Sequence, residues 1–349
     1  MDTTKLEEFA AQIAQERVGA ALSLLTHLGD QLGIWRAMAG AGPLTSADLA
    51  ERTGLAERYL REWLAGQAVA GHVEYAGGRY TLPPEHAAVL ADDDSPVAQA
   101  GAVQANAAMW LAADAIAEAF RTGEGFGWHR HDVRLFEGTA RFFGPLYRQS
   151  LTQQWLPALD GVTARLESGA RVLDVGCGHG SSTVLMAQAY PNSRFEGLDS
   201  HAGSITQAAQ AAVKAGVEDR VRFTVGEAGQ GRTGPWDLVC FFDALHDMGD
   251  PVGAAARARG QLAADGTLLV VEPYAADRFE DRIGDPVSMV YYAASTLCCV
   301  PNSLAQDTGT ALGAQAGESR ILRVLRDAGF TRARLALATD YNLVFEARG

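Results

Sequence analysis

The sequence predicts an α/β protein in which a mostly parallel sheet carries helices on both faces and follows a mainly helical N-terminal region. Three observations support this prediction. A short apolar run at 172–175 breaks into a glycine-rich turn, and an alanine-rich segment of helical character follows. Further short apolar runs recur downstream, as expected where strands alternate with helices. The chain before residue 90 combines short helical segments with one hairpin signal.

The glycine turn narrows the type of ligand site. Residues 172–180 read Val-Leu-Asp-Val-Gly-Cys-Gly-His-Gly, which places Asp174 two residues before the first glycine. Glycine lets the backbone approach a ligand where a side chain would collide. A dinucleotide fingerprint, G-x-G-x-x-G/A, would require glycine or alanine at Ser181 or, one step later, at Thr183. The turn therefore fits a nucleotide-type ligand but not that fingerprint.

Polar residues end the apolar runs that follow the turn. The run 195–198 ends at Asp199, and the run 221–225 is followed by Gly226-Glu227. The segment 236–242 leads into Asp243, and the run 267–271, preceded by Gly266, ends at Glu272-Pro273. A helix over 320–329 and two closing antiparallel strands, over 333–338 and 342–347, complete the predicted sheet.

In this order, across roughly the C-terminal half of the chain, the motifs resemble those of class I S-adenosylmethionine-dependent methyltransferases. The resemblance implies a Rossmann-like sheet, S-adenosylmethionine as methyl donor and S-adenosylhomocysteine as product. Asp199 is expected to accept hydrogen bonds from ribose hydroxyls, as the acid of a dinucleotide site does. Helices before the first strand form one active-site wall in the resembled enzymes. The expected cofactor-binding residues are Asp174, Gly176, Gly178, His179, Gly180, Asp199, Ser200, Glu227, Asp243, Tyr147 and Trp155.

Residues 45–82 outline a winged helix. Two short helices, over 47–52 and 57–70, flank a turn at Thr53-Gly54, and a hairpin signal spans 73–82. Four arginines stand against five acidic residues in 45–82, a net charge of −1 that is unfavourable for phosphate contacts. Small-molecule O-methyltransferases of plants and actinobacteria carry a similar domain that they use for dimerisation. The resemblance therefore implies a homodimer rather than a DNA-binding protein.

Three regions are expected along the chain. They are a winged-helix dimerisation domain over 1–90, a helical linker and active-site cap over 91–150, and a Rossmann-like methyltransferase domain over 151–349. A long segment at about 274–318 follows the fifth strand, at the edge of the sheet where ligands bind in open α/β folds. We expect it to be a helical substrate lid with Tyr291, Tyr292, Ser295 and Cys299 at the substrate.

Composition limits the partners and the compartment. The net charge of −13 argues against a nucleic-acid partner and against an anionic membrane surface. We find no signal-peptide pattern and no apolar run of spanning length. The four cysteines lack C-x-x-C spacing and suit reduced thiols, so a cytoplasmic location is expected.

His246 is the expected general base. The segment Asp243-Ala244-Leu245-His246-Asp247 resembles the Leu-His-Asp segment of winged-helix O-methyltransferases, whose histidine removes the acceptor proton. An unperturbed pKa near ~6.5 suits that role at neutral pH. Asp247 or a more distant acid is expected to orient the ring. The alternative is a histidine at a helix start that makes a structural hydrogen bond.

No metal ion is expected at this site. Some similar methyltransferases that act on the carbon of α-keto acids hold a metal with the His-Asp pair and a later histidine. No histidine follows His246 here, and only Cys298 or Cys299 could substitute, with a changed metal preference. Burial of this cysteine pair in the lid is the alternative.

The predicted function is methyl transfer to a small-molecule acceptor, with O-methylation of a hydroxyl in secondary metabolism favoured. Methylation at carbon, nitrogen or sulfur is the first rival. A winged-helix regulator that senses S-adenosylmethionine, and a catalytically silent subunit that only binds the cofactor, are rivals of other classes. The sequence leaves the acceptor open.

Overall fold

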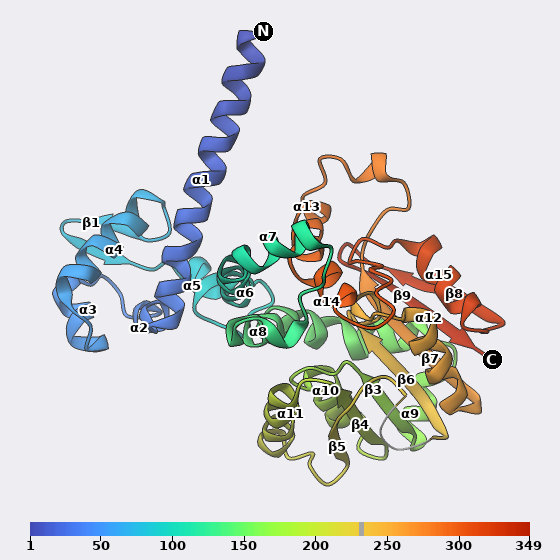
Figure 1. The fold of residues 1–349 in the computed structure, drawn as a ribbon. Helices are drawn as coiled ribbons and strands as arrows, with labels where there is room; N and C mark the ends of the chain where they lie inside the picture. Colours follow the sequence, from blue (N-terminus) through green and yellow to red (C-terminus); the bar gives the residue numbers. More distant parts are fainter. Residues whose placement is uncertain (230–233) are drawn as a thin grey trace. The chain divides into compact units, whose positions relative to one another are not determined.

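The computed structural model describes residues 1–229 and 234–349. Contacts divide the chain into two compact units, which are treated separately below (Figure 1). The first comprises Met1–Ala108 with Glu137–Pro145, and the second comprises Met109–Phe136 with Leu146–Gly349. The expected middle region, 91–150, is thus shared between the two units.

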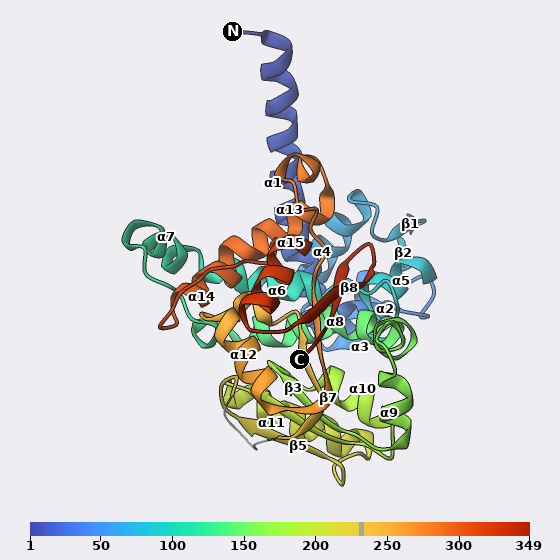
Figure 2. The same cartoon turned by 90° about the vertical axis from the view of Figure 1, so that its right-hand side faces the viewer.

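The first unit is mainly helical and contains one hairpin. Its elements are α1 (Thr3–Gln31), α2 (Ile34–Met38), α3 (Ser46–Thr53), α4 (Glu57–Val69), β1 (Glu74–Ala76), β2 (Arg79–Thr81), α5 (Pro84–Leu90), most of α6 (Ala100–Leu111) and part of α8 (Val133–Ser150). The N-terminal half of α1 extends away from the rest of its own unit (Figure 2). The order of helices and hairpin is that of a winged helix, as the sequence predicts.

Local sequence explains why these elements begin and end where they do. The hydroxyl of Thr45 accepts from the backbone N–H of Asp48, whose carboxylate accepts from the N–H of Thr45, so a capping box starts α3. Gly54 ends α3 in the left-handed conformation, φ 70°. Each strand of the hairpin lies one residue nearer the turn than the sequence predicts. Gly77 and Gly78, with φ of 56° and 82°, close a two-residue turn.

The second unit is built on one sheet. Over the described residues, its order is β5-β4-β3-β6-β7-β9-β8, with β3 to β7 parallel and β8 and β9 antiparallel. The bounds are β3 (Arg171–Val175), β4 (Arg194–Asp199), β5 (Val221–Val225), β6 (Trp236–Phe242), β7 (Leu262–Pro273), β8 (Arg332–Ala338) and β9 (Asn342–Arg348). The predicted fold class is confirmed. The fifth strand begins earlier than predicted, because the chain is already paired with Trp236 at Leu262, before an irregularity in register.

The helices of the second unit lie on both faces of the sheet. They are α7 (Ala113–Thr122), α9 (Val162–Ser168), α10 (Ser181–Ala189), α11 (Ala202–Ala215), α12 (Pro251–Gln261), α13 (Pro286–Ala294), α14 (Val300–Leu304) and α15 (Glu318–Asp327). Short 3-10 or π-helical segments are η1 (Trp128–Arg130), η2 (Leu151–Trp155), η3 (Leu156–Ala158), η4 (Leu245–Asp247), η5 (Phe279–Arg282) and η6 (Ser295–Cys299).

Strand β3 shows how the two layers are assigned. Leu173 and Val175 belong to the same apolar core as α12 and α15. Asp174, between them, points to the opposite face and accepts hydrogen bonds from α10. The expected lid region carries η5, α13, η6 and α14. Among the residues searched, which are those described, no helix combines the length and apolarity needed to span a membrane.

Candidate active site

The candidate site lies at the carboxyl edge of the parallel strands, where β3, β4, β6 and β7 all end. Strand ends converge at this edge because the strands are parallel and neighbouring, and open α/β folds bind ligands there. The polar residues that end the predicted strands, from Asp174 to Glu272, are therefore brought together although they are distant in sequence.

The glycine turn after β3 has the conformation that its sequence predicts. Gly176, Gly178 and Gly180 all have positive φ, at 75°, 52° and 76°. A Cβ on Gly176 would lie 2.7 Å from the Cβ of Ala244, so the turn and the loop after β6 approach each other more closely than alanine would allow. The N–H groups of Gly176, Cys177, Gly178 and Gly180 donate within the protein, so what the turn offers a ligand is close approach to the backbone at Gly178, where an added Cβ would meet no atom within 4 Å.

Asp174 shapes this turn rather than facing outward. Its Oδ2 accepts hydrogen bonds of 2.6 Å from the hydroxyls of Ser182 and Thr183, in the first turn of α10. Burial raises the pKa of Asp174 to about 6. Its Oδ1 accepts no hydrogen bond from the described residues. Asp174 therefore fixes the start of α10 through Oδ2, while Oδ1 can still accept a hydrogen bond.

Asp199 holds the next part of the site. Its Oδ2 accepts from the backbone N–H of Gly178 at 2.9 Å, and its Oδ1 accepts from that of His201 at 2.8 Å. Each carboxylate oxygen has a second lone pair, so the group can still accept from ribose hydroxyls. Of the other predicted cofactor residues, His179 is half-buried in the turn, whereas Ser200 and Glu227 are exposed beside their strand ends.

An aromatic stack borders this end of the site and was not predicted. The rings of Phe136 and His201 are parallel, with centroids 4.2 Å apart, and Trp128 meets Phe136 edge-on at 5.5 Å. His201 comes two residues after Asp199, so the stack stands beside the expected ribose position. The sequence gives little indication of this stack, because Phe136 lies 65 positions before His201 in the chain.

His246 lies in η4, directly after β6, and is almost fully buried. Its Nδ1 makes a short hydrogen bond with the carboxylate of Glu272. The other oxygen of Glu272 accepts from the backbone N–H groups of Leu245 and His246, at 3.0 and 3.3 Å. Glu272 thus fixes the orientation of the imidazole ring, whose Nε2 faces Asp247. The sequence predicts Glu272 only as the end of a strand; a carboxylate directly after an apolar run is the available signal.

Two negatively charged carboxylates flank the imidazole ring of His246. Its Nε2 lies 3.2 Å from Oδ1 of Asp247, in addition to the Glu272 contact at Nδ1. Burial alone would lower the pKa of His246, but the two carboxylates outweigh burial and hold that pKa well above its usual value. A raised pKa makes the imidazole a stronger base, although a smaller fraction of it is unprotonated at neutral pH.

Asp243 occupies a strained position next to His246. Its φ of 49° is in the left-handed region, which is unusual for a residue other than glycine. Its carboxylate accepts from Asn342 Nδ2 at 3.1 Å and from the hydroxyl of Tyr147 at 3.4 Å. Burial and the nearby carboxylate of Glu272 raise the pKa of Asp243 to about 8. Strain of this kind is concentrated at functional sites.

Tyr147 and Trp155 form an aromatic wall with Phe242. The ring centroids of Tyr147 lie 5.7 Å from those of Trp155 and 5.9 Å from those of Phe242. Trp155 is fully buried, and its Nε1 donates no hydrogen bond to a described residue. Tyr147 reaches the site through its hydroxyl, whereas Trp155 supports the wall from behind.

The four predicted lid residues divide into two pairs. Cys299 lies beside His246 and Asp247, with the candidate ligand atoms of all three within 4.8 Å of one another. Tyr291 is buried, and burial together with the charge of Asp243 raises the pKa of its hydroxyl. Tyr292 and Ser295 instead line a separate cavity of about 510 Å³ within the lid region. There Tyr292 accepts from Arg282 at 2.8 Å, and Ser295 accepts from the N–H of Ala314 at 3.1 Å.

The lid region is bonded directly to the loop that carries His246. Asn302 Nδ2 donates to the carbonyl oxygen of Asp247 at 3.1 Å, and the hydroxyl of Ser303 donates to that of Met248 at 2.9 Å. The side-chain oxygen of Asn302 also accepts from the backbone N–H of Trp128 at 2.8 Å. These bonds hold α14 and the Trp128 loop against the strand ends.

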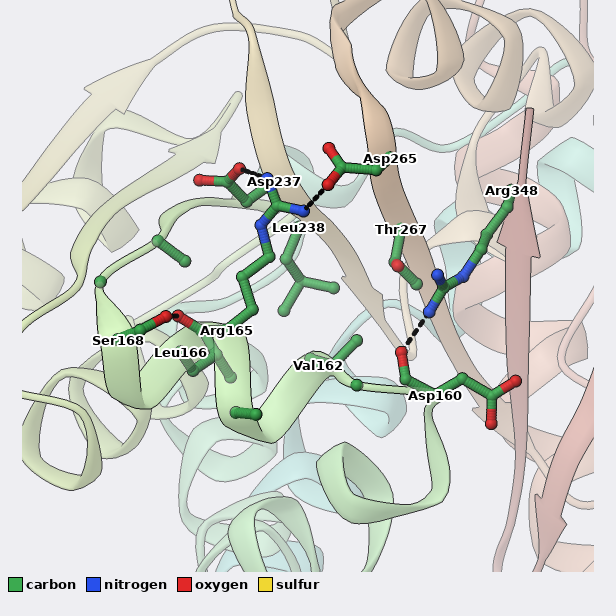
Figure 3. Close-up of a pocket in the computed structure, with 14 residues that line it drawn as sticks. Asp160, Val162, Arg165, Leu166, Ser168, Asp237, Leu238, Asp265, Thr267 and Arg348 are labelled. Atoms are coloured by element: carbon green, nitrogen blue, oxygen red, sulfur yellow. Dashed lines mark hydrogen bonds and ion pairs between the residues drawn. The ribbon is translucent and has the colours of Figure 1, made fainter.

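A larger cavity, of about 600 Å³, lies at the opposite edge of the sheet (Figure 3). Arg165 crosses it and donates to Asp237 and Asp265 at 2.5 Å each, and Arg348 donates to the carbonyl oxygen of Asp160. In Figure 3, Arg165 is paired with both Asp237 and Asp265, and Arg348 contacts the backbone of Asp160. This cavity is remote from the strand ends and offers no buried, unsatisfied group among the described residues that line it.

Two family models match the chain. Residues 20–92 match an Rv2258c-like winged helix-turn-helix domain, and residues 166–329 match a methyltransferase domain. A protein-L-isoaspartate O-methyltransferase of Methylorubrum extorquens is 30% identical over 163 residues, which are 44% of this chain and 70% of that protein. A 27-O-demethylrifamycin SV methyltransferase of Amycolatopsis mediterranei is 30% identical over 126 residues, 34% of this chain and 46% of that one. The first curated relatives are matched over only a quarter to a half of their length.

Solved structures match over nearly the whole chain. The mitomycin 7-O-methyltransferase MmcR has a TM-score of 0.72 at 24% identity, with 99% of both chains covered. Human N-acetylserotonin methyltransferase, solved in complex with S-adenosylmethionine, has a TM-score of 0.66 at 21% identity, covering 100% of this chain and 98% of that one. At such identities these matches show a shared fold.

Proposed function

Because the chain belongs to the class I S-adenosylmethionine-dependent methyltransferases with an N-terminal winged helix-turn-helix domain, we propose that it methylates a hydroxyl oxygen of a small molecule, with His246 as general base. The observation that carries this proposal is the buried His246–Glu272 pair at the carboxyl edge of the sheet, next to the glycine turn.

The strand ends fit the cofactor. The open space beside Gly178 lets a ligand approach the backbone, and the oxygens of Asp199 retain lone pairs for ribose hydroxyls. Asp243 and Tyr147 supply a polar group and a hydroxyl at the next strand end. When bound, S-adenosylmethionine supplies a methyl group on a positively charged sulfur that leaves as a neutral thioether. The protein's task is then to align the acceptor and to remove its proton.

His246 is placed for that proton. Glu272 accepts at Nδ1, which leaves Nε2 to take the proton of an acceptor hydroxyl while its oxygen forms the new bond to the methyl carbon. The carbon–sulfur bond breaks with its electron pair going to sulfur, so charge is balanced. The two carboxylates stabilise the imidazolium that forms. Apolar and aromatic walls around such a site favour a small organic acceptor, in line with Tyr147, Trp155 and Phe242.

Two measurements test this function. The first is thermal unfolding with S-adenosylhomocysteine, S-adenosylmethionine and NAD added separately, since a ligand that binds only the native state raises the melting temperature. A rise with both sulfur compounds and none with NAD is expected. No rise with either would overturn the proposal.

The second measurement is methyl transfer by His246→Ala to phenols, keto acids, amines and thiols. Loss of the base is expected to lower turnover on hydroxyl acceptors by roughly 10²–10⁴-fold. His129→Ala is the matched control, because His129 is exposed. Full turnover in His246→Ala would favour the rival acceptors, since an amine or a thiol needs little help with its proton. A salt-dependent shift of duplex DNA would favour the regulator, which the acidic winged helix argues against.

The partner that we propose for the first unit is a second copy of this chain, not a nucleic acid or a membrane. Leu6, Phe9, Ile13 and Leu24 lie on one stripe of α1 and are 47–61% exposed. A stripe of this kind is typical of a helix that packs against another helix. The expected result is a dimer by light scattering that Leu6→Glu, Phe9→Glu and Ile13→Glu together convert to a monomer. Thr4→Glu, Ala11→Glu and Gln15→Glu, on the opposite face, are the control and should leave a dimer.

A further inference from the structure

The lid brings a thiol close to the imidazole ring of His246. Cys299, in η6, is a free and buried cysteine whose sulfur lies within 4.8 Å of a ring nitrogen of His246 and of a carboxylate oxygen of Asp247. His246 and Asp247 are adjacent in η4, so two separate elements supply the three groups. A nitrogen, an oxygen and a sulfur that converge in this way form a set of metal ligands.

The arrangement contains an electrostatic conflict. Glu272 accepts a hydrogen bond from Nδ1 of His246, so a neutral ring would direct its Nε2 lone pair toward the negative Oδ1 of Asp247, 3.2 Å away. That oxygen is buried and accepts no hydrogen bond of good geometry from the described residues. A proton on Nε2 or on Oδ1, the thiol proton of Cys299, or a metal ion between the groups would each relieve the repulsion.

The spacing suits a tetrahedral metal ion. Two ligands bound at about 2.0–2.1 Å in tetrahedral geometry are roughly 3.3 Å apart, close to the 3.2 Å between Nε2 and Oδ1. Glu272 supplies the carboxylate that a metal-bound histidine usually meets at its other nitrogen. The cysteine favours softer ions such as Zn²⁺ over Mg²⁺ or Ca²⁺.

We propose that His246, Asp247 and Cys299 form a binding site for a soft divalent cation of the Zn²⁺ class, and that its occupation inhibits the enzyme. Binding releases the thiol proton of Cys299 and the Nε2 proton of His246, since a metal binds the thiolate and the neutral imidazole. The metal then holds the lone pair with which His246 would accept the acceptor's proton. The inhibition rests on the proposed base role, whereas the binding does not.

Cobalt absorption tests the binding in the full-length, reduced protein under anaerobic conditions. Co²⁺ bound by a thiolate gives a near-ultraviolet charge-transfer band that nitrogen and oxygen ligands do not give. The band is expected in the wild type, with loss on addition of Zn²⁺. Cys299→Ser should abolish it and weaken Zn²⁺ binding by about 100-fold or more, because the soft ligand is removed. Glu272→Gln should weaken binding by roughly 10–100-fold, as loss of a supporting carboxylate does.

Cys298→Ser is the matched control. Cys298 is also buried in η6 and is adjacent in sequence, but it is absent from the cluster. This variant should keep the cobalt band and its affinity. Absence of the band in the wild type, or the same band in Cys299→Ser, would overturn the site.

Methyl transfer tests the inhibition separately. Zn²⁺ should lower the wild-type rate, a chelator should restore it, and Cys299→Ser should resist at least about tenfold more Zn²⁺ relative to its own metal-free rate. A rate that rises with Zn²⁺ would overturn inhibition. If no acceptor is methylated at all, the proposed function fails while the cobalt band still decides the site.

Discussion

The two edges of the sheet differ in whether their carboxylates are paired with arginines. At the amino edge, Arg165 is paired with Asp237 and Asp265 (Figure 3). Glu346 is paired there with Arg334 and Arg348. At the carboxyl edge, the carboxylates of Asp243, Asp247 and Glu272 surround one histidine. No arginine or lysine pairs with these three carboxylates among the interactions of the described residues.

The amino edge is arranged to stabilise the fold, whereas the carboxyl edge is arranged for chemistry. Guanidinium–carboxylate pairs at the amino edge neutralise one another, and those of Arg165 tie α9 to Asp237 of β6 and Asp265 of β7. The carboxyl edge keeps groups with shifted pKa values and unsatisfied oxygens, which stabilise the fold poorly but suit proton transfer and ligand binding. The larger cavity therefore lies at the edge where the charges are already neutralised.

The largest expected effect is that of Glu272→Gln at the carboxyl edge. Loss of this carboxylate should lower kcat by about 100-fold, because the ring of His246 loses its orientation and its negative neighbour. The pKa of His246 should fall, so the rise of kcat/KM with pH should move to lower pH. A purely structural role would change stability without moving the pH profile, and Glu272→Asp should restore part of the rate.

Acid should destabilise the protein through His131. Burial, with the charge of Arg130, lowers the pKa of His131 to about 4 in the folded state, against about 6.5 when unfolded. The unfolded chain therefore binds the extra proton, and stability present above pH 6.5 is lost as pH falls toward 4, by about 2 kcal/mol after solvent screening. Urea unfolding across this range measures it. His131→Phe should flatten the slope; an unchanged slope would contradict the assignment.

Glu346→Gln is the amino-edge counterpart of Glu272→Gln. Both carboxylates are buried, on the neighbouring strands β9 and β7. Removing the Glu346 charge leaves Arg334 and Arg348 without their shared partner and should lower the free energy of unfolding by about 2 kcal/mol, less than for a fully buried pair. Turnover should stay within about twofold. A large loss of kcat at normal stability would break the comparison between the edges.

The smallest expected effect is that of Arg165→Met. The guanidinium is 35% exposed and Asp265 is 72% exposed, so the lost pairs are worth about 1 kcal/mol or less. Methionine keeps most of the apolar contact of the stem. Chemical denaturation should show this small loss, and added salt should reduce the difference from the wild type. A salt-independent loss of several kcal/mol would indicate a packing role instead.

Sequence patterns were sufficient to predict the order of strands and helices, the glycine turn and the position of His246 after the fourth strand. These features are local: glycines are needed where φ is positive, and apolar runs end where strands end. Local patterns also predicted the winged helix. Each hairpin strand lies one residue nearer the turn than predicted, because Gly77-Gly78 alone form the turn.

Which side chains meet could not be predicted from local patterns, because it depends on how the elements pack. Glu272 lies 26 residues from His246 and Cys299 lies 53 residues away, yet parallel pairing of β6 and β7 and the return of the lid bring both to one ring. The same packing turns Tyr292 and Ser295 away into their own cavity. A sequence pattern fixes the face of an element on which a residue lies, but distance across elements depends on register and packing, which no local pattern encodes.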